Sequence, residues 1–244
     1  MNISPDFLRM HGKMNKFLVK EIFSFNECLF SQLFEEATYA WEPLSFLDNF
    51  FEAVELGKKE SPILDGVHLV HPELITIGAN VIIEPGAFIR GPCILGDGCE
   101  VRHCAYLRGH VVAGKHCVLG HSSEFKRVIL LDDVCAAHFN YVGDSILGNG
   151  VNLGAGVKLA NLRLDNEDVQ VFDRGKKFST NLKKLGAIIG DGAKIGCNSV
   201  TNPGTVIGKG AFCYPNLTIG GYVRPKAIMK PTQKVESHVN GNGI

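Results

Sequence analysis

The sequence predicts an all-β fold, a parallel β-helix, because three features of the chain indicate one repeating coil. An apolar residue returns every six residues over long stretches. Glycine often follows that position, and a small residue often precedes it by two. The recurring positions, which we expect to point inward, are Ile77, Ile83, Ile89, Leu95, Val101, Leu107, Ala113, Leu119, Phe125, Leu131, Leu147, Leu153, Ile189, Ile195, Thr201, Ile207, Cys213 and Ile219.

A period of six fits neither an α-helix, which has 3.6 residues per turn, nor a flat strand, which alternates at two. It fits a short strand followed by a tight turn. Three such hexads close a triangular coil of about 18 residues, and stacked coils pair as parallel strands about 4.8 Å apart. Glycine supplies the positive φ that such corners need, so the glycine-rich stretch 138–156 is compatible with regular structure.

The chain divides into three parts, the second of which contains an insertion. Residues 1–62 are rich in aromatic residues and lack the period of six, which predicts a helical region that packs on the first coil. Residues 63–225 form the β-helix. Residues 162–185 interrupt the hexads and alternate in polarity, which predicts an extruded hairpin or loop. Residues 226–244 are expected to form an extended tail.

Composition excludes several classes of protein. Lys plus Arg and Asp plus Glu both number 25, which gives no reason to expect nucleic acid. No apolar run reaches the roughly 18 residues of a membrane span, and the first residues lack a signal-peptide core, so we expect a cytoplasmic protein. Without a C-x-x-C pair, no compact zinc site is expected. Four cysteines instead precede inward positions by two and are expected to be buried small residues: Cys93, Cys99, Cys117 and Cys135.

Cations recur once per coil. Arg90, Arg108 and Lys126 are each 18 residues apart, and Asp144 continues the series. Like charges about 5 Å apart repel unless an anion compensates them. The series is therefore either a solvated stripe or a phosphate site, for which Arg is well suited.

Histidines form a second series. His103 and His121 are 18 apart, and His138 follows after 17 residues. A general base, a metal ligand and plain polar surface are all open for such histidines. His116 and His121 also have the H-x4-H spacing found in part of the ligand set of γ-class carbonic anhydrases.

Five segments carry a resemblance to a known family: LRG at 107–109, EFK at 124–126, HFNYVGDS at 138–145, VNLGAG at 151–156 and AN at 160–161. In these, and with no gap between Arg108 and Asn161, the chain resembles the acetyltransferase domain of the bifunctional uridyltransferase/glucosamine-1-phosphate acetyltransferases. It is similar also to related archaeal sugar-phosphate acyltransferases. The wider likeness covers about 65–225 and implies a left-handed β-helix built from hexapeptide repeats.

The resemblance implies a role for particular residues in transfer from acetyl-CoA to an amino-sugar 1-phosphate. His138 would be the general base, Glu124 its acidic partner, and Asn161 a neighbour of the amine and thioester. The implied sugar-phosphate contacts are Arg108, Lys126, Tyr141 and Asn152, and the implied acetyl-CoA contacts are Ala155, Cys197 and Lys230. A histidine can take the proton from the attacking amine, so neither a covalent intermediate nor a metal is required.

This sequence departs from the family pattern at several positions. Gly109 and His110 replace a Pro-Gly pair, Leu162 replaces an aromatic residue, and Cys197 replaces a serine. A further substrate lysine falls in the insertion, where Lys176 or Lys177 could serve. Residues 1–62 contain no glycine-rich nucleotide loop, so no uridyltransferase activity is expected in this chain.

Two alternatives remain open at this point. The chain could be a non-catalytic, sugar-nucleotide-binding or regulatory β-helix, or a metalloenzyme like the γ-carbonic anhydrases. The fold resemblance also implies a homotrimer, because clefts between neighbouring prisms commonly form the active sites in this fold.

Overall fold

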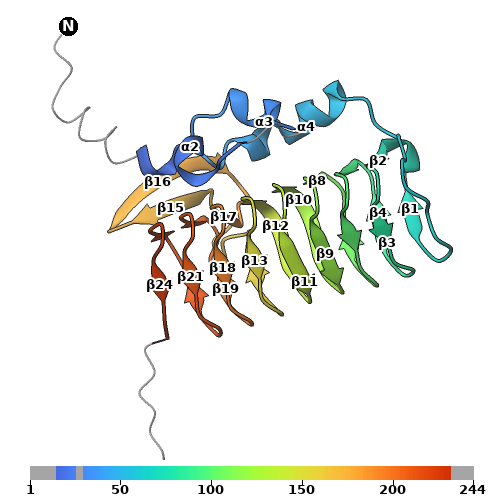
Figure 1. Cartoon of the computed structure of the whole chain (residues 1–244). Coiled ribbons are helices and arrows are strands. Elements are labelled where there is room, and N and C mark those ends of the chain that lie inside the picture. Colours follow the sequence, from blue (N-terminus) through green and yellow to red (C-terminus); the bar gives the residue numbers. More distant parts are fainter. Residues whose placement is uncertain (1–14, 26–29, 232–244) are drawn as a thin grey trace, which may run out of the picture.

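The computed structural model describes residues 15–25 and 30–231 and shows a triangular prism of stacked parallel strands (Figure 1). This confirms the predicted left-handed parallel β-helix with a helical N-terminal region and an extruded hairpin. We name its faces the covered face, the eight-stranded face and the site face, in the order in which each coil visits them from β5.

Each face is a ladder of short strands. The covered face contains β2 (Ile75–Ile77), β5 (Cys93–Leu95), β8 (Val111–Ala113), β17 (Ala187–Ile189), β20 (Thr205–Ile207) and β23 (Tyr222–Val223). The eight-stranded face contains β3 (Ile82–Ile83), β6 (Glu100–Val101), β9 (Val118–His121), β11 (Cys135–His138), β13 (Asn152–Leu153), β18 (Lys194–Ile195), β21 (Phe212–Cys213) and β24 (Ile228–Met229).

The site face contains β1 (His68–Val70), β4 (Phe88–Arg90), β7 (Tyr106–Leu107), β14 (Lys158–Leu159), β19 (Val200–Thr201) and β22 (Thr218–Ile219). Two longer strands, β10 (Glu124–Leu130) and β12 (Tyr141–Leu147), begin on this face and continue around a corner onto the covered face. Residues beyond 231 of the expected tail lie outside the described part of the chain.

The inward positions are buried as predicted from Ile77 to Phe125. The next one is wrong: Leu130, not Leu131, pairs with Ala113 and lies in the prism core. The reason is a shortened corner at Arg127, whose φ is 52°. Cys93, Cys99 and Cys117 are buried as expected, but the shift places Cys135 on the half-exposed surface of β11 and Val134 in the core.

The N-terminal helices lie along the covered face, not on the first coil as the sequence suggested (Figure 1). They are η1 (Asn15–Phe17), α2 (Val19–Ile22), α3 (Gln32–Glu35) and α4 (Pro43–Ala53), and a further short helix, η2 (Pro72–Leu74), precedes β2. Pro43 begins α4, a position that suits its fixed φ. None of the described helices is long and apolar enough to cross a bilayer.

This placement has a physical cause in the covered face. Its outward side chains form an apolar ladder, one residue per coil: Ile94, Val112, Ile129, Ile146, Ile188 and Val206. Burying this ladder stabilises the fold by about 25 cal/mol per Å² of apolar area removed from water. The buried side of α4, which includes Leu47 and Phe50, packs on this ladder.

The insertion forms an antiparallel hairpin of β15 (Val169–Asp173) and β16 (Lys176–Leu182). It leaves the prism after Asn161, at the corner between the site face and the covered face. The N–H of Leu185 donates to the Asn161 carbonyl at 3.0 Å, so the two ends of the insertion meet.

Candidate functional site

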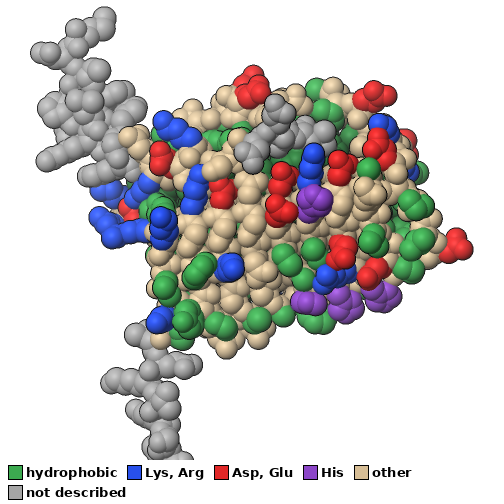
Figure 2. Space-filling view, in the orientation of Figure 1, with side chains coloured by type: hydrophobic (Ala, Val, Ile, Leu, Met, Phe, Trp, Pro, Cys, Tyr) green, Lys and Arg blue, Asp and Glu red, His purple; other side chains and the backbone are tan. Residues whose placement is uncertain are grey.

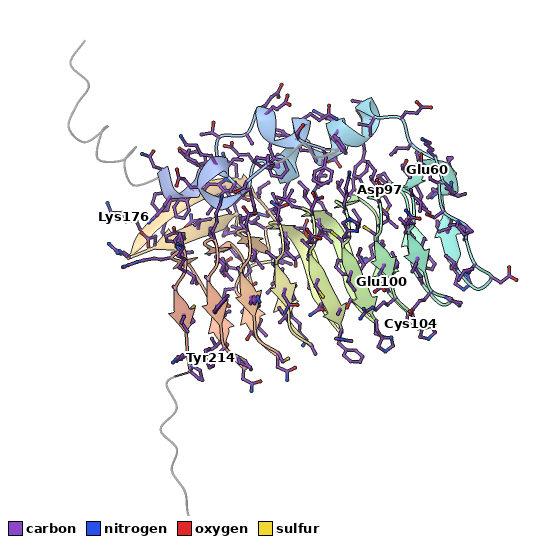
Figure 3. All side chains as sticks on the ribbon, in the orientation of Figure 1. Glu60, Asp97, Glu100, Cys104, Lys176 and Tyr214 are labelled. Atoms are coloured by element: carbon purple, nitrogen blue, oxygen red, sulfur yellow. The ribbon has the colours of Figure 1, made fainter. Side chains whose placement is uncertain are left out.

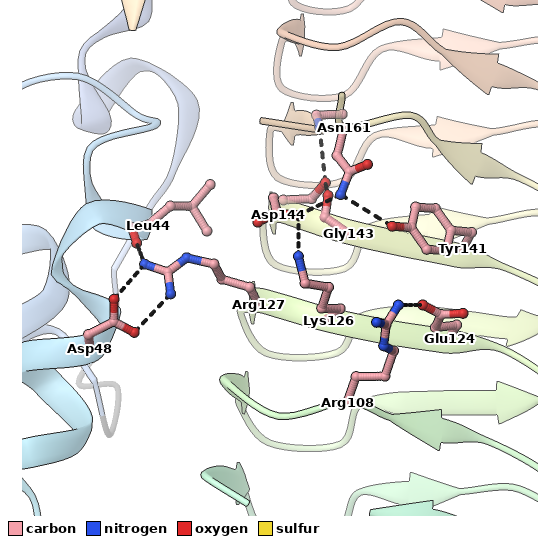
Figure 4. Close-up of polar contacts among 12 residues, drawn as sticks. Leu44, Asp48, Arg108, Glu124, Lys126, Arg127, Tyr141, Gly143, Asp144 and Asn161 are labelled. Atoms are coloured by element: carbon pink, nitrogen blue, oxygen red, sulfur yellow. Dashed lines mark hydrogen bonds and ion pairs between the residues drawn. The ribbon is translucent and has the colours of Figure 1, made fainter. Parts of the chain in front are cut away.

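The corner between the site face and the covered face, which we call the cation edge, carries the predicted cations (Figure 4). Arg108 follows β7 and donates from Nη1 to Glu124 Oε1 at 2.7 Å. Its guanidinium also lies 5.8 Å from the Tyr106 ring centroid. Because Glu124 begins β10 in register with Tyr106 and Tyr141, its carboxylate lies between two aromatic side chains on the same face.

Asp144 is the centre of the second half of this cluster. Its carboxylate is almost fully buried and accepts hydrogen bonds from Lys126 Nζ, at 3.3 Å, and from the Asn161 side-chain amide. The same Asn161 amide donates to Tyr141 Oη at 3.2 Å. The Asp144 carboxylate thus fixes both the Lys126 ammonium group and the Asn161 carboxamide, which are predicted to meet the substrate.

The sequence placed Asp144 in the cation series, one coil above Lys126, and this is wrong in detail. The residue in register with Lys126 is Gly143. Asp144 follows at the corner with a φ of 46°, and its side chain is buried. Its ion pair with Lys126 agrees with the compensating anion that the cation series needs, whereas its hydrogen bond from Asn161 was not predicted.

Burial raises the pKa of Tyr141, and the hydrogen bond from Asn161 only partly opposes this shift. Since the unperturbed phenol titrates near pH 10, Tyr141 keeps its proton at neutral pH. It can therefore donate a hydrogen bond to an anionic ligand.

The N-terminal region reaches the cation edge through Asp48 on α4. Both Asp48 oxygens accept from the Arg127 guanidinium, at 2.8 and 3.0 Å (Figure 4). His110 Nε2 lies 3.1 Å from Asp48 Oδ1. The hydrogen bonds from Arg127 lower the pKa of Asp48, and burial lowers that of His110. Arg127 is thereby held beside Lys126 but turned toward the helix, and no local sequence pattern predicts this contact.

The corner between the eight-stranded face and the site face, the histidine edge, carries His138 at the end of β11. The His138 side chain is exposed, and its ring makes no hydrogen bond or ion pair with another described residue. Its backbone is fixed, because Gly156 N–H donates to its carbonyl at 3.0 Å. Glu124, the expected partner of His138, engages Arg108 instead.

A row of histidines marks this edge in the space-filling view (Figure 2). The rings of His103 and His121 stack with centroids 5.9 Å apart, and Phe139 meets His121 edge-on at 5.1 Å. Of the H-x4-H pair, His116 precedes β9 by two residues and His121 is its last residue. No group of three or more His, Cys, Asp or Glu among the described residues could hold a metal ion.

The predicted coenzyme contacts lie farther along the histidine edge. Ala155 accepts from the Asn198 N–H at 2.8 Å, and exposed Cys197 is one coil above it. Lys230 Nζ lies 5.4 Å from the Tyr214 ring. Figure 3 shows Tyr214 and Cys104 along this same edge of the prism.

Two predicted contacts are not brought to the cation edge within one chain. Asn152 begins β13 in register with Cys135 and Lys194, so it lies on the eight-stranded face, which does not border the cation edge. Lys176 lies at the end of the hairpin and points away from the prism (Figure 3). Lys177, its neighbour on β16, lies over the Phe172 ring at 5.8 Å.

Comparison with known proteins agrees with this fold. Residues 75–109 match the family model described as bacterial transferase hexapeptide (six repeats). The bifunctional sugar-1-phosphate nucleotidylyltransferase/acetyltransferase of Sulfurisphaera tokodaii is 35% identical over 71% of this chain and 42% of its own length. The bifunctional protein GlmU of Methanococcus maripaludis strain C5 is 37% identical over 78% of this chain and 46% of its own length.

The chain thus spans less than half the length of these curated relatives. Among solved structures, UDP-N-acetylglucosamine acyltransferase from Campylobacter jejuni aligns over 68% of this chain and 70% of its own, with 12% identity and a TM-score of 0.49. Residues 75–109 thus carry the repeat of the bacterial transferase hexapeptide model, and over its β-helix the chain resembles the bifunctional nucleotidylyltransferase/acetyltransferases.

Proposed function

We propose that this chain transfers an acetyl group from acetyl-CoA to the amine of an amino-sugar 1-phosphate. The observation that carries the proposal is the cluster at the cation edge, where Asp144 fixes Lys126 and Asn161 beside Tyr141. The Sulfurisphaera tokodaii relative, whose name combines sugar-1-phosphate and acetyltransferase, supports this reaction class.

The phosphate would bind Arg108 and Lys126. Both cations have an acidic partner, which limits their mutual repulsion while the site is empty of substrate. Arg108 is 42% exposed at its side chain, so it can turn from Glu124 to an arriving phosphate without losing its support on Tyr106. The protonated Tyr141 would add a neutral donor.

His138 would act as general base. As the substrate amine attacks the thioester carbonyl, its proton passes to the imidazole, the C–N bond forms and the C–S bond breaks. The imidazolium then protonates the departing thiolate. The Asn161 amide is a candidate donor to the developing oxyanion, and Glu124 could serve His138 once the phosphate has taken Arg108.

Acetyl-CoA would lie along the histidine edge. Ala155 and Cys197 are small residues one coil apart there, which leaves the backbone accessible to a long ligand. Lys230, at the far end of the same edge, offers a cation to the coenzyme phosphates. Acetyl-CoA is the co-substrate that we propose, and the proposed reaction uses no metal ion.

A homotrimer would complete the site. Asn152 lies on a different part of the prism from Tyr141 and Lys126, so a sugar bound at one chain's cation edge could meet Asn152 of a neighbouring copy. Light scattering would test this, and a monomeric active enzyme would contradict it.

The decisive experiment measures CoA release with glucosamine 1-phosphate and galactosamine 1-phosphate. We expect amine-dependent release that His138→Ala abolishes and that the matched variant His103→Ala preserves. Release that does not need the amino sugar, or that survives His138→Ala, would refute the proposal. Tight sugar-phosphate binding without any release would instead favour a non-catalytic binding module, which the missing contact between Glu124 and His138 makes a real alternative. Stoichiometric zinc or iron required for activity would favour a metalloenzyme.

A further inference from the structure

A cavity lies farther along the cation edge, toward the C-terminal coils. Its volume is about 530 Å³, and it is open to solvent between the last coils and the end of the hairpin. The residues that line it are Phe172, Asp173, Arg174, Asn202, Pro203, Gly220, Gly221, Tyr222 and Arg224. None of them belongs to the candidate acyl-transfer site.

The charge on this cavity is unbalanced. The described arginines with an acidic partner are Arg102, Arg108, Arg127 and Arg163. Arg174 and Arg224 form no ion pair with any described residue, yet both line this one cavity. The cavity's own acid, Asp173, is already neutralised by Lys16. Figure 2 shows Lys and Arg side chains gathered at this hairpin end of the molecule.

Neutral donors complete the lining. The N–H groups of Gly220 and Gly221 donate to no other described residue, and Gly221 has a φ of 70°. Such turns present backbone N–H groups to anions. The Asn202 side-chain nitrogen would lie only 2.9 Å from a Cβ on Gly220, so the amide sits directly over this turn.

Tyr222 adds a phenol at the rim. Burial and the carboxylate of Asp173 raise its pKa, while nearby Arg224 lowers it, so the group remains a protonated donor near neutral pH. The exposed ring of Phe172 supplies an apolar wall. Two guanidinium groups, an amide, a phenol and free backbone N–H groups together suit one ligand chemistry, because planar guanidinium groups match phosphate oxygens.

We propose that this cavity binds a phosphate-bearing small molecule, at a site separate from Arg108 and Lys126. A Cβ on Gly221 would lie 2.9 Å from the Phe172 carbonyl oxygen, so the glycine lets the hairpin pack against this corner, and the hairpin contributes Arg174 to the lining. This proposal does not depend on acyl transfer, since none of its residues takes part in that reaction.

Inorganic pyrophosphate is the probe for the test, at constant ionic strength. Calorimetry gives the affinity, and hydrogen–deuterium exchange of the 218–224 segment reports on this cavity alone. We expect protection of that segment in the wild type and in Arg108→Gln. Replacing both arginines, Arg174→Gln with Arg224→Gln, should remove the protection and weaken site-specific binding at least tenfold.

Lys226→Gln is the matched control, because Lys226 is an exposed cation two residues from Arg224 that does not line the cavity. It should leave the protection unchanged. If Lys226→Gln and the double arginine variant lose protection and affinity equally, pyrophosphate is held by general charge attraction rather than by this cavity. That result would overturn the proposal. Protection confined to the Arg108 segment, or none at all, would overturn it as well.

Discussion

Lys126→Met should destabilise the protein more than Asp144→Asn, although both substitutions break the same ion pair. Asp144 is 4% exposed at its side chain and Lys126 is 26% exposed. Removing the lysine leaves a buried carboxylate with only the Asn161 amide as a side-chain donor. Removing the carboxylate charge leaves an amine that can reach water, and the new carboxamide still accepts from Asn161.

Breaking a fully buried pair costs roughly 3–5 kcal/mol. Because Asn161 remains and Lys126 is partly solvated, we expect about 2–3 kcal/mol for Lys126→Met and about 1 kcal/mol for Asp144→Asn. The double variant removes both charges and should resemble Asp144→Asn alone. Urea denaturation at neutral pH measures these differences, with exposed Lys115→Met as a control expected within about 0.5 kcal/mol of the wild type. Equal losses in the two single variants, or additive losses in the double variant, would refute the argument.

Three other perturbations have equally defined outcomes. Ile129→Ala, beneath the N-terminal helices, should cost about 2–4 kcal/mol in urea denaturation, whereas Ile82→Ala on the open eight-stranded face should cost under about 1 kcal/mol; similar costs would contradict the covering role of the helices. His138→Ala should lower kcat for acetyl transfer by about 10²–10⁴-fold with little change in unfolding free energy, and normal turnover would exclude it as the base. Asp48→Asn should lower stability by under about 1 kcal/mol at neutral pH; because the folded-state pKa of Asp48 lies below 3.8, the loss should vanish as pH falls through that lowered pKa. A difference that persists in acid would rule out the ion pair as its cause.

Much of the fold was predictable because a hexad repeat leaves few alternatives. Burial from Ile77 to Phe125 follows directly from the period. The first error arises where two leucines are adjacent: Leu130 and Leu131 are equally apolar, so composition cannot show that the corner before them is one residue short. The apolar ladder on the covered face was visible in the sequence but indistinguishable from the core until the register was fixed.

The candidate site was predictable only in part, for the same reason. Arg108 and Lys126 share a corner because no slip separates them. The following coil from Phe125 to Val142 has 17 residues, which moves Asp144 into the interior and gives it a function as a shared acceptor. The Asp48–Arg127 contact joins residues far apart in sequence and carries no local signal.

The insertion has a consequence for how such a protein can change. Strand β14 before it and β17 after it both pair with β12, as though the intervening chain were absent. A corner can therefore accept a graft of new chain without altering the register of any coil. The hairpin brought Arg174 to a wall of the prism by this route, so new chemistry can be added at corners while the scaffold's inward positions stay under unchanged selection.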